Sequence, residues 1–408
     1  MGWKDVGCSI WAVAWIGGSI ACCCLALHYS DEGAPNLYRG ALPLSAGFDH
    51  SCAVFDSVGL RCWGGNDRGQ IGDGSTEQRL SRTPVPGFET GALSLSAGFH
   101  STCAVTPKGK LMCWGANDFG QLGTGTTKDS AVPASVTGLE TGTVAVSVGE
   151  EFACAIAAAP GTDSRGAKCW GRNQDGRVGD GTDVDKRTPT NVLGLEANVD
   201  TVSAGHHHAC AIVAGSVKCW GDNSMGQLGD GTRVSKRVPT QAVGLTKGVT
   251  SITAGGGHTC AMVSPSVGGT SVPPQVFCWG KNVKGQLGDG TTEQRLVPTQ
   301  ITGFESRVLA ISAGSSHTCA ITPNDKIWLS VVCWGSNGMR QIGDDADFDR
   351  TRPTKVEHIN ENFDKISAGA YHTCLGTAST KVGCWGNNRS GQLGYGYVNT
   401  RVIPQNVD

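Results

Sequence analysis

Fourteen of the 18 cysteines fall into seven pairs that recur along the 408-residue chain at a nearly constant interval. The first members of successive pairs lie 51, 51, 56, 50, 59 and 55 residues apart. A period of this length indicates a repeat architecture, in which each unit packs against its neighbours. The pairs are Cys52 with Cys62, Cys103 with Cys113, Cys154 with Cys169, Cys210 with Cys219, Cys260 with Cys278, Cys319 with Cys333, and Cys374 with Cys384.

The same motifs surround every pair. The second cysteine precedes Trp-Gly, and a loop like Gly-Gln-Leu-Gly-Asp-Gly-Thr (226–232) follows. A Pro-x-x-(Val/Ile) segment comes next. The unit ends at Ala-Gly-x-x-His in five copies, while Ser101 and Phe152 take the place of the histidine in the other two. In the second unit we expect strands near 93–98, 103–106 and 110–114. A fourth strand starts near the proline or lies at an edge, because proline cannot donate a ladder bond. Seven four-stranded units predict an all-β, seven-bladed β-propeller.

The two ends of the chain suggest how the ring closes. The first unit lacks a preceding Pro-x-x-Val strand, and residues 401–407 supply one at the C-terminus. We therefore expect the C-terminal strand to pair into the blade begun by the N-terminal strands. Closure by pairing of the N- and C-terminal strands leaves no open sheet edge between the first and last blades.

The paired cysteines favour disulfides. Cys103 and Cys113 face one another if Pro107, Lys108 and Gly109 form a three-residue hairpin loop, and opposed cysteines on antiparallel strands lie within disulfide reach. Each bond would contribute about 2–3 kcal/mol. Buried reduced thiols are the alternative. No pair has the Cys-x-x-Cys spacing of redox or zinc sites.

Residues 1–30 form a separate segment. Residues 6–27 are an uncharged, mostly apolar run of a length that can span a bilayer. A cleaved signal peptide, a retained anchor and a packed core helix all fit this run, and Cys22, Cys23 and Cys24 offer acylation sites. Residues 31–40 are then a short linker and 41–408 the propeller. Export and disulfides together predict a secreted or extracytoplasmic protein, with membrane contact only through residues 6–27 if they are uncleaved.

Composition excludes several classes. The 60 glycines have no period of three, so the chain is not collagen. Hydrophobic residues make up 39% and the net charge is −2, which argues against disorder. The 33 Lys and Arg residues are balanced in number by 35 Asp and Glu residues, so the chain lacks the excess of basic residues typical of nucleic-acid-binding proteins. We therefore expect no nucleic-acid partner.

The sequence carries no recognised catalytic or metal motif. It lacks Gly-x-Ser-x-Gly, the phosphate-binding loop and His-Glu-x-x-His. The Asp-Gly loops lack EF-hand spacing, and His206 and His208 share a strand face without a third ligand. We therefore predict no catalytic residue, metal or cofactor. An acidic pocket around Glu150 and Glu151 is the remaining enzymatic hypothesis.

The motifs resemble those of the regulator of chromosome condensation repeat family across residues 40–408. The cysteine-paired form is similar to secreted bacterial members, including β-lactamase-inhibitor propellers. The resemblance implies the propeller fold, which hosts unrelated activities. It also implies that partners dock on the face of the Gly-x-x-His turns. Nucleotide exchange on a small GTPase, as in the nuclear founder of the family, is the alternative function that the resemblance raises.

Function is expected where the repeats differ, at the two variable residues of each Gly-x-x-His turn. These positions mix aromatic and charged side chains, as interface anchors do. The sequence predicts a monomeric, non-catalytic scaffold that binds a protein or other macromolecule, and an inhibitor of an extracellular enzyme is the narrower form of this hypothesis. The predicted partner-binding residues are Phe48, Asp49, Phe99, His100, Glu150, Glu151, His206, His207 and Tyr371.

Overall fold

The computed structural model describes residues 43–406 except 159–160, 162–163, 265, 268–269, 272–273, 324–328, 360–362 and 378–380. The described residues belong to one unit, Leu37–Asp408. The predicted targeting segment 1–30 and linker 31–40 lie outside the described residues. Among the residues described, no helix is long and apolar enough to cross a bilayer.

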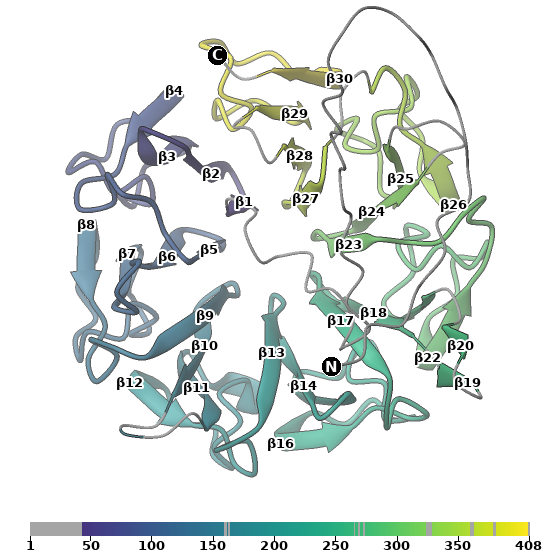
Figure 1. Ribbon diagram of the computed structural model, residues 1–408, viewed down its shortest axis with the longest axis horizontal. Coiled ribbons are helices and arrows are strands. Elements are labelled where there is room, and N and C mark those ends of the chain that lie inside the picture. Colours follow the sequence, from purple (N-terminus) through teal and green to yellow (C-terminus); the bar gives the residue numbers. More distant parts are fainter. Residues whose placement is uncertain are drawn as a thin grey trace, which may run out of the picture. The chain divides into compact units, whose positions relative to one another are not determined.

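Seven four-stranded antiparallel sheets follow one another along the chain and form the blades of a propeller (Figure 1). The first strand of each blade lies innermost and the last outermost, which confirms the predicted all-β fold. Blades 1 to 4 are built from β1 (Leu44–Ala46), β2 (His50–Phe55), β3 (Gly59–Gly64), β4 (Arg79–Pro84); β5 (Ser94–Ala97), β6 (Ser101–Val105), β7 (Leu111–Gly115), β8 (Ser130–Ser135); β9 (Thr143–Val148), β10 (Phe152–Ala158), β11 (Arg165–Gly171), β12 (Lys186–Asn191); and β13 (Val199–Ala204), β14 (His208–Val213), β15 (Ser216–Gly221), β16 (Lys236–Gln241).

The last three blades repeat this arrangement. A two-stranded ribbon, β19 (Ser266–Val267) and β20 (Thr270–Ser271), lies between the middle strands of blade 5, and a short 3-10 turn, η1 (Gln174–Gly176), follows β11. Blades 5 to 7 are built from β17 (Val249–Ala254), β18 (His258–Val263), β21 (Gln275–Gly280), β22 (Arg295–Ile301); β23 (Ala310–Ala313), β24 (His317–Pro323), β25 (Leu329–Gly335), β26 (Arg350–Lys355); and β27 (Lys365–Ala368), β28 (His372–Gly376), β29 (Val382–Gly386), β30 (Arg401–Asn406).

The two middle strands of each blade form the hairpin that carries the cysteines. In blade 2, Val105 pairs with Leu111, and the loop between them ends at Gly109 with a φ of 78°. Cys103 then stands opposite Cys113, as predicted.

All seven predicted disulfides are present in the structure. The two Cα atoms of each bond lie 4.0–4.1 Å apart, because the cysteines stand directly opposite one another on the two middle strands. The bonds join Cys52 to Cys62, Cys103 to Cys113, Cys154 to Cys169, Cys210 to Cys219, Cys260 to Cys278, Cys319 to Cys333, and Cys374 to Cys384.

The fourth strand begins earlier than predicted. β8 starts three residues before Pro133, so the proline lies within the strand. The ladder tolerates it because β8 is the outer strand of its sheet, and the missing N–H faces away from the neighbouring strand at an edge. The predicted edge position is therefore confirmed, while the predicted start is corrected.

The predicted closure is wrong. β30 pairs with β29 of its own blade, with Cys384 opposite Gln405, and β1 pairs with β2. The outer strand of every blade pairs with the strand that precedes it in its sheet, so among the described strands no blade combines strands from both ends of the chain. The ring closes through hydrogen bonds between blades 7 and 1: the Ala46 N–H donates to Ser367 Oγ (2.9 Å), and the Ala370 N–H donates to the Gly47 carbonyl (3.0 Å).

A hydrogen bond like the one from Ala46 to Ser367 joins every pair of neighbouring blades near the centre of the ring. A main-chain N–H on the innermost strand of one blade donates to a serine or threonine hydroxyl of the blade before it, at 2.9–3.0 Å. Seven such bonds link the seven blades in a ring, and the bond between blades 7 and 1 closes it. The donors and acceptors are Ala46 with Ser367, Ala97 with Ser45, Val148 with Ser96, Ala204 with Ser147, Ala254 with Ser203, Ala313 with Thr253, and Ala368 with Ser312.

The tryptophans of the Cys-Trp-Gly motifs form the second set of contacts between blades. All seven are fully buried, and each packs in an apolar core between two blades. Each indole N–H donates to a main-chain carbonyl of the preceding blade at 2.8–3.0 Å, so burial leaves no indole donor unpaired. The pairs are Trp63 with Gln392, Trp114 with Gln70, Trp170 with Gln121, Trp220 with Arg177, Trp279 with Gln227, Trp334 with Gln286, and Trp385 with Gln341.

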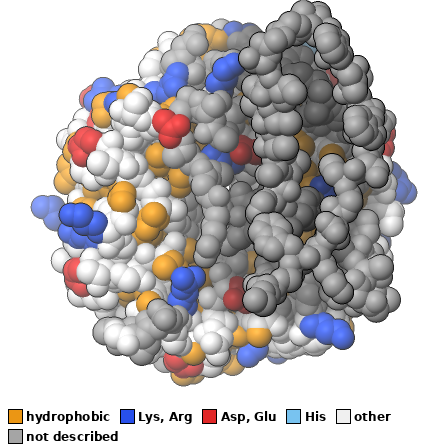
Figure 2. Space-filling model, viewed as in Figure 1, with side chains coloured by type: hydrophobic (Ala, Val, Ile, Leu, Met, Phe, Trp, Pro, Cys, Tyr) orange, Lys and Arg blue, Asp and Glu red, His pale blue; other side chains and the backbone are white. Residues whose placement is uncertain are grey.

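The coloured part of the surface in Figure 2 carries both signs of charge. Lys and Arg side chains alternate with Asp and Glu side chains over the blades at the left of the view, and hydrophobic side chains lie between them. No large basic patch is visible on that part of the described surface, which agrees with the near balance of charge in the sequence.

Candidate functional site

The seven turns at the Gly-x-x-His positions converge at the centre of the ring around a cavity of about 100 Å³. The glycine of each motif is required by close approach. A Cβ on Gly205 would lie 2.6 Å from Cε1 of His208, whose ring packs against it. The first variable residue of each turn lines the cavity, namely Phe48, Phe99, Glu150, His206, Gly256, Ser315 and Ala370. We call this set the channel mouth.

Aromatic rings lie at the channel mouth on blades 1 and 2, and Tyr371 of blade 7 lies beside it against Phe48. The ring centroids of Phe48 and Phe99 lie 3.8 Å apart, and Tyr371 meets Phe48 edge-on at 5.5 Å. Both phenylalanines are half-buried, while Tyr371 is 37% exposed. The structure thus brings three predicted partner-binding residues from the two ends of the chain into one cluster. We call Phe48, Phe99 and Tyr371 the aromatic cluster.

A carboxylate and two imidazoles occupy the next part of the mouth. Glu150 Oε2 lies 2.8 Å from His207 Nε2 and 3.6 Å from His206 Nδ1. The hydrogen bond from His207 lowers the pKa of Glu150, against the effect of burial. Burial lowers the pKa of His206, although Glu150 opposes this shift. His206 also reaches across the side-chain-free Gly256 to Ser315 Oγ at 2.8 Å.

Sequence reasoning missed the arginines beside this group. Arg172 Nη1 contacts Glu151 Oε2 at 2.5 Å, so the second predicted glutamate is already paired. Arg177 takes the place of the usual loop glutamine; it is almost fully buried, and its Nη2 lies 3.4 Å from Asp175. Burial lowers the pKa of Arg177. The departure of Arg177 from the Gly-Gln-Leu pattern was the available signal.

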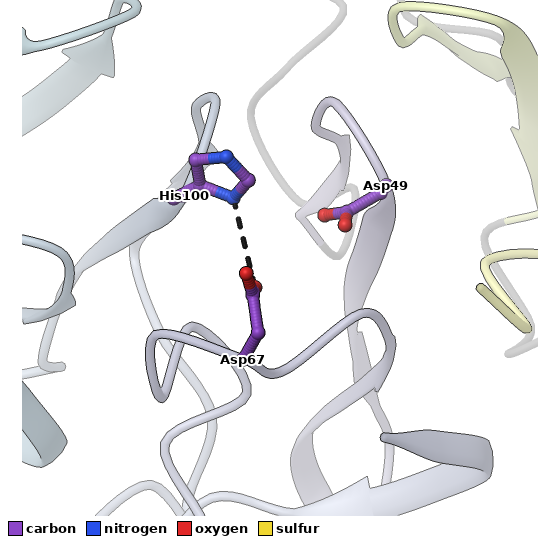
Figure 3. A group of neighbouring side chains, drawn as sticks. All are labelled: Asp49, Asp67 and His100. Atoms are coloured by element: carbon purple, nitrogen blue, oxygen red, sulfur yellow. Dashed lines mark ion pairs between the residues drawn. The ribbon is translucent and has the colours of Figure 1, made fainter. Parts of the chain in front are cut away.

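Asp49 and His100 lie close to a second carboxylate, that of Asp67, between blades 1 and 2 (Figure 3). The Gln70 amide nitrogen lies 3.0 Å from Asp67 and 3.5 Å from both Asp49 and His100, while its oxygen accepts the main-chain N–H of Arg68. An amide donor therefore serves the position that a cation would take. Burial raises the pKa of Asp49, but hydrogen bonds and nearby histidines outweigh it and hold the pKa below its usual value.

The repeated histidine two residues before the first cysteine lies beneath this surface and is fully buried. In five blades its Nε2 contacts a serine or threonine hydroxyl of the next blade at 2.8–2.9 Å. Where that hydroxyl donates to a glutamine carbonyl, the imidazole is the donor to it. The histidine fixes neighbouring blades. The pairs are His50 with Thr102, His208 with Thr259, His258 with Thr318, His317 with Thr373, and His372 with Ser51.

The Asp-Gly loops also have a structural role. Asp73 accepts from the Ser75 N–H and forms an ion pair with Arg79, while Asp230 accepts from the Thr232 N–H and pairs with Lys236. Nearby asparagines donate to the same loops. These bonds bind the loop to the start of the outer strand.

Two models of the regulator of chromosome condensation (RCC1) repeat match the chain. One covers residues 108–156, 169–212, 214–262, 275–321 and 330–375, and a second covers 44–70, 93–121, 308–341 and 363–392. The chain belongs to the RCC1-repeat family. The matched segments span all seven blades, as the resemblance of the sequence motifs implied.

Relatives of this RCC1-repeat propeller differ in length and in what they are named for. The ultraviolet-B receptor UVR8 of Arabidopsis thaliana is 30% identical over 91% of this chain and 82% of its own length. The E3 ubiquitin-protein ligase HERC2 of Homo sapiens is 28% identical over 85% of this chain, which spans 7% of HERC2. Yeast RCC1 (Prp20), solved bound to Kap60, superposes with a TM-score of 0.71 at 18% identity, covering 91% of this chain and 86% of that chain. At that identity the likeness shows the fold.

Proposed function

We propose that this RCC1-repeat propeller is an extracytoplasmic, non-catalytic scaffold that binds a protein partner at the channel mouth. The observation that carries the proposal is the aromatic cluster of Phe48, Phe99 and Tyr371. Three large rings gathered on turns that differ from blade to blade have the composition of interface anchors.

The rigidity of the ring supports this role. Seven hydroxyl bonds, seven indole bonds and seven disulfides hold the turns in fixed relative positions. A preordered surface loses little conformational entropy on binding. Disulfides in every blade also support an oxidising compartment. Inhibition of an extracellular enzyme is the narrower form of the proposal.

Affinity capture with the full chain tests the proposal. The triple variant Phe48→Ala, Phe99→Ala, Tyr371→Ala should lose the proteins that the wild type retains, because truncating anchors removes most of the binding energy. The matched control is Leu193→Ala, Val238→Ala, Val243→Ala, which truncates three exposed apolar side chains away from the mouth. Capture should survive in this control. Each captured protein is then purified and its affinity measured with both variants; equal affinity for the channel-mouth variant would contradict the proposal.

A further inference from the structure

We infer that the channel mouth binds a cationic side chain, best an arginine, presented by an exposed segment of the partner. This inference rests on the proposed function and names the chemistry that the partner must carry. It follows from the charge that surrounds the aromatic cluster and from the shape of the mouth.

The carboxylates around the aromatic cluster are not matched by basic groups. Glu150 contacts two histidines, and burial keeps one of them, His206, neutral at neutral pH by lowering its pKa to about 4. Asp49 and Asp67 contact the uncharged amide of Gln70. Three carboxylates therefore border the mouth on blades 1 and 3 without a lysine or arginine in ion-pair contact among the described residues.

The arginines on the same side of blades 1 and 3 are already paired. Arg68 bonds both Asp118 and Asp129, at 2.7 Å each. Arg172 holds Glu151, and Arg177 lies 3.4 Å from Asp175. The partners of Glu150, Asp49 and Asp67 are therefore histidines and the Gln70 amide, and these arginines are engaged elsewhere. An acidic ligand would be repelled there, and an aliphatic one would bury Glu150 without a cation, which is costly.

The shape of the mouth favours a flat cation. The small residues Gly256, Ser315 and Ala370 line the same cavity as Phe99 and Glu150, and the His206 ring extends over Gly256 to Ser315. Phe99 and Glu150 lie on neighbouring turns, and both are close to His206: the Phe99 and His206 ring centroids are 6.4 Å apart. A guanidinium can stack on an aromatic ring while it donates two parallel bonds to a carboxylate. An ammonium lacks that planar geometry.

Fluorescence polarisation with the full chain and labelled peptides tests the inference. The probes are one glycine- and serine-flanked peptide with a central arginine and three versions with citrulline, lysine or glutamate. Citrulline keeps the shape of arginine and removes its charge. The arginine peptide should bind saturably at millimolar concentrations. The citrulline peptide should bind about tenfold more weakly, because the interaction of a cation with an aromatic ring increases the affinity by about that factor. The lysine peptide should fall between them.

Two variants locate the binding. Glu150→Gln should weaken the arginine peptide about tenfold and leave the citrulline peptide unchanged. Asp200→Asn is the matched control, because it removes one exposed negative charge near the other end of β13 and should change neither. Equal binding of arginine and citrulline peptides, tighter binding of the glutamate peptide, no saturable binding of the arginine peptide, or an unaffected Glu150→Gln variant each overturns the inference. If partner capture still depends on the aromatic cluster in that case, the proposed function stands and only the cation is wrong.

Discussion

Five junctions between blades carry the bond between the repeated histidine and a hydroxyl, and two lack it. Where blade 2 meets blade 3, Ser101 replaces the histidine and Ala153 replaces the hydroxyl residue. Where blade 3 meets blade 4, the replacements are Phe152 and Ala209. Histidine and hydroxyl are thus lost together at both places. The histidine is therefore one half of a bond between blades, and its absence from two blades has a structural reason.

The two kinds of junction share the other contacts between blades. The Trp170 and Trp220 indoles still donate to the preceding blade, and the Val148 and Ala204 N–H groups still donate to its serines. Phe152 is fully buried and fills the place of the imidazole. A natural comparison between a hydrogen-bonded and an apolar solution therefore exists within one ring.

Acid should destabilise the histidine-containing junctions most strongly. Burial lowers the pKa of four junction histidines to about 3, from an ordinary value of 6.5. The unfolded chain binds more protons between these values, so stability is fully present above about pH 6.5 and falls as the pH drops toward 3. Each histidine should contribute a slope of up to ~1.4 kcal/mol per pH unit. The four are His208, His258, His317 and His372.

Thermal unfolding between neutral pH and about pH 4.5 measures this slope before most carboxylates titrate. Hydrogen exchange measured for each blade compares junctions with and without the histidine. Amides of blades 4 to 7 should lose protection before those at the blade 2/3 junction. A stability that stays level over this range would contradict the buried, neutral histidines.

Removing one half of a polar junction should have the next largest effect. In Thr318→Val the shape is kept, but His258 Nε2 loses its hydroxyl partner and the Gln286 carbonyl loses one of its donors. Leaving a buried polar group unpaired should lower the free energy of unfolding by about 1–3 kcal/mol. Urea unfolding at unchanged m-value measures it. Thr318→Ser is the control, since Ser51 already serves this role against His372; equal losses in both variants would refute the role of the hydroxyl.

Exchanging one kind of junction for the other should have the smallest effect. The double variant His208→Phe, Thr259→Ala reproduces the pairing of Phe152 with Ala209 at the blade 4/5 junction. Replacing both partners by apolar groups should change the free energy of unfolding by less than about 1 kcal/mol. The single variants should each cost more, so a double-mutant cycle should show a favourable coupling. Additive losses would mean that the two residues do not act as a pair.

Local spacing made much of the fold predictable. The hairpin of Cys103 and Cys113 depends on a short run of consecutive residues, and its loop glycine could be recognised from the sequence alone. The closure could not. In a cyclic repeat the period does not say where a blade begins, and the segment around Pro404 can be assigned to either neighbour until the hydrogen bonds to β29 are known.

The candidate site was predictable as a set of positions and not as a geometry. Phe48, Phe99 and Tyr371 were expected on one face, but their stacking depends on turns that are far apart in sequence. Arg172 and Gln70 come from the long loops between the third and fourth strands, which fold back over the turns. No local sequence pattern predicts the path of such a long loop, so these contacts could not be predicted from the sequence.

The self-contained blades described above have a consequence for how such a chain can change. Because every blade is one uninterrupted stretch and closure uses the same bonds as every other junction, the boundary between the first and last blades is not structurally special. Duplication or loss of one unit in the gene would add or remove a whole blade without dividing a strand. A circular permutant that begins before β5 and joins Asn406 to Leu44 through a linker would retain all seven blades intact.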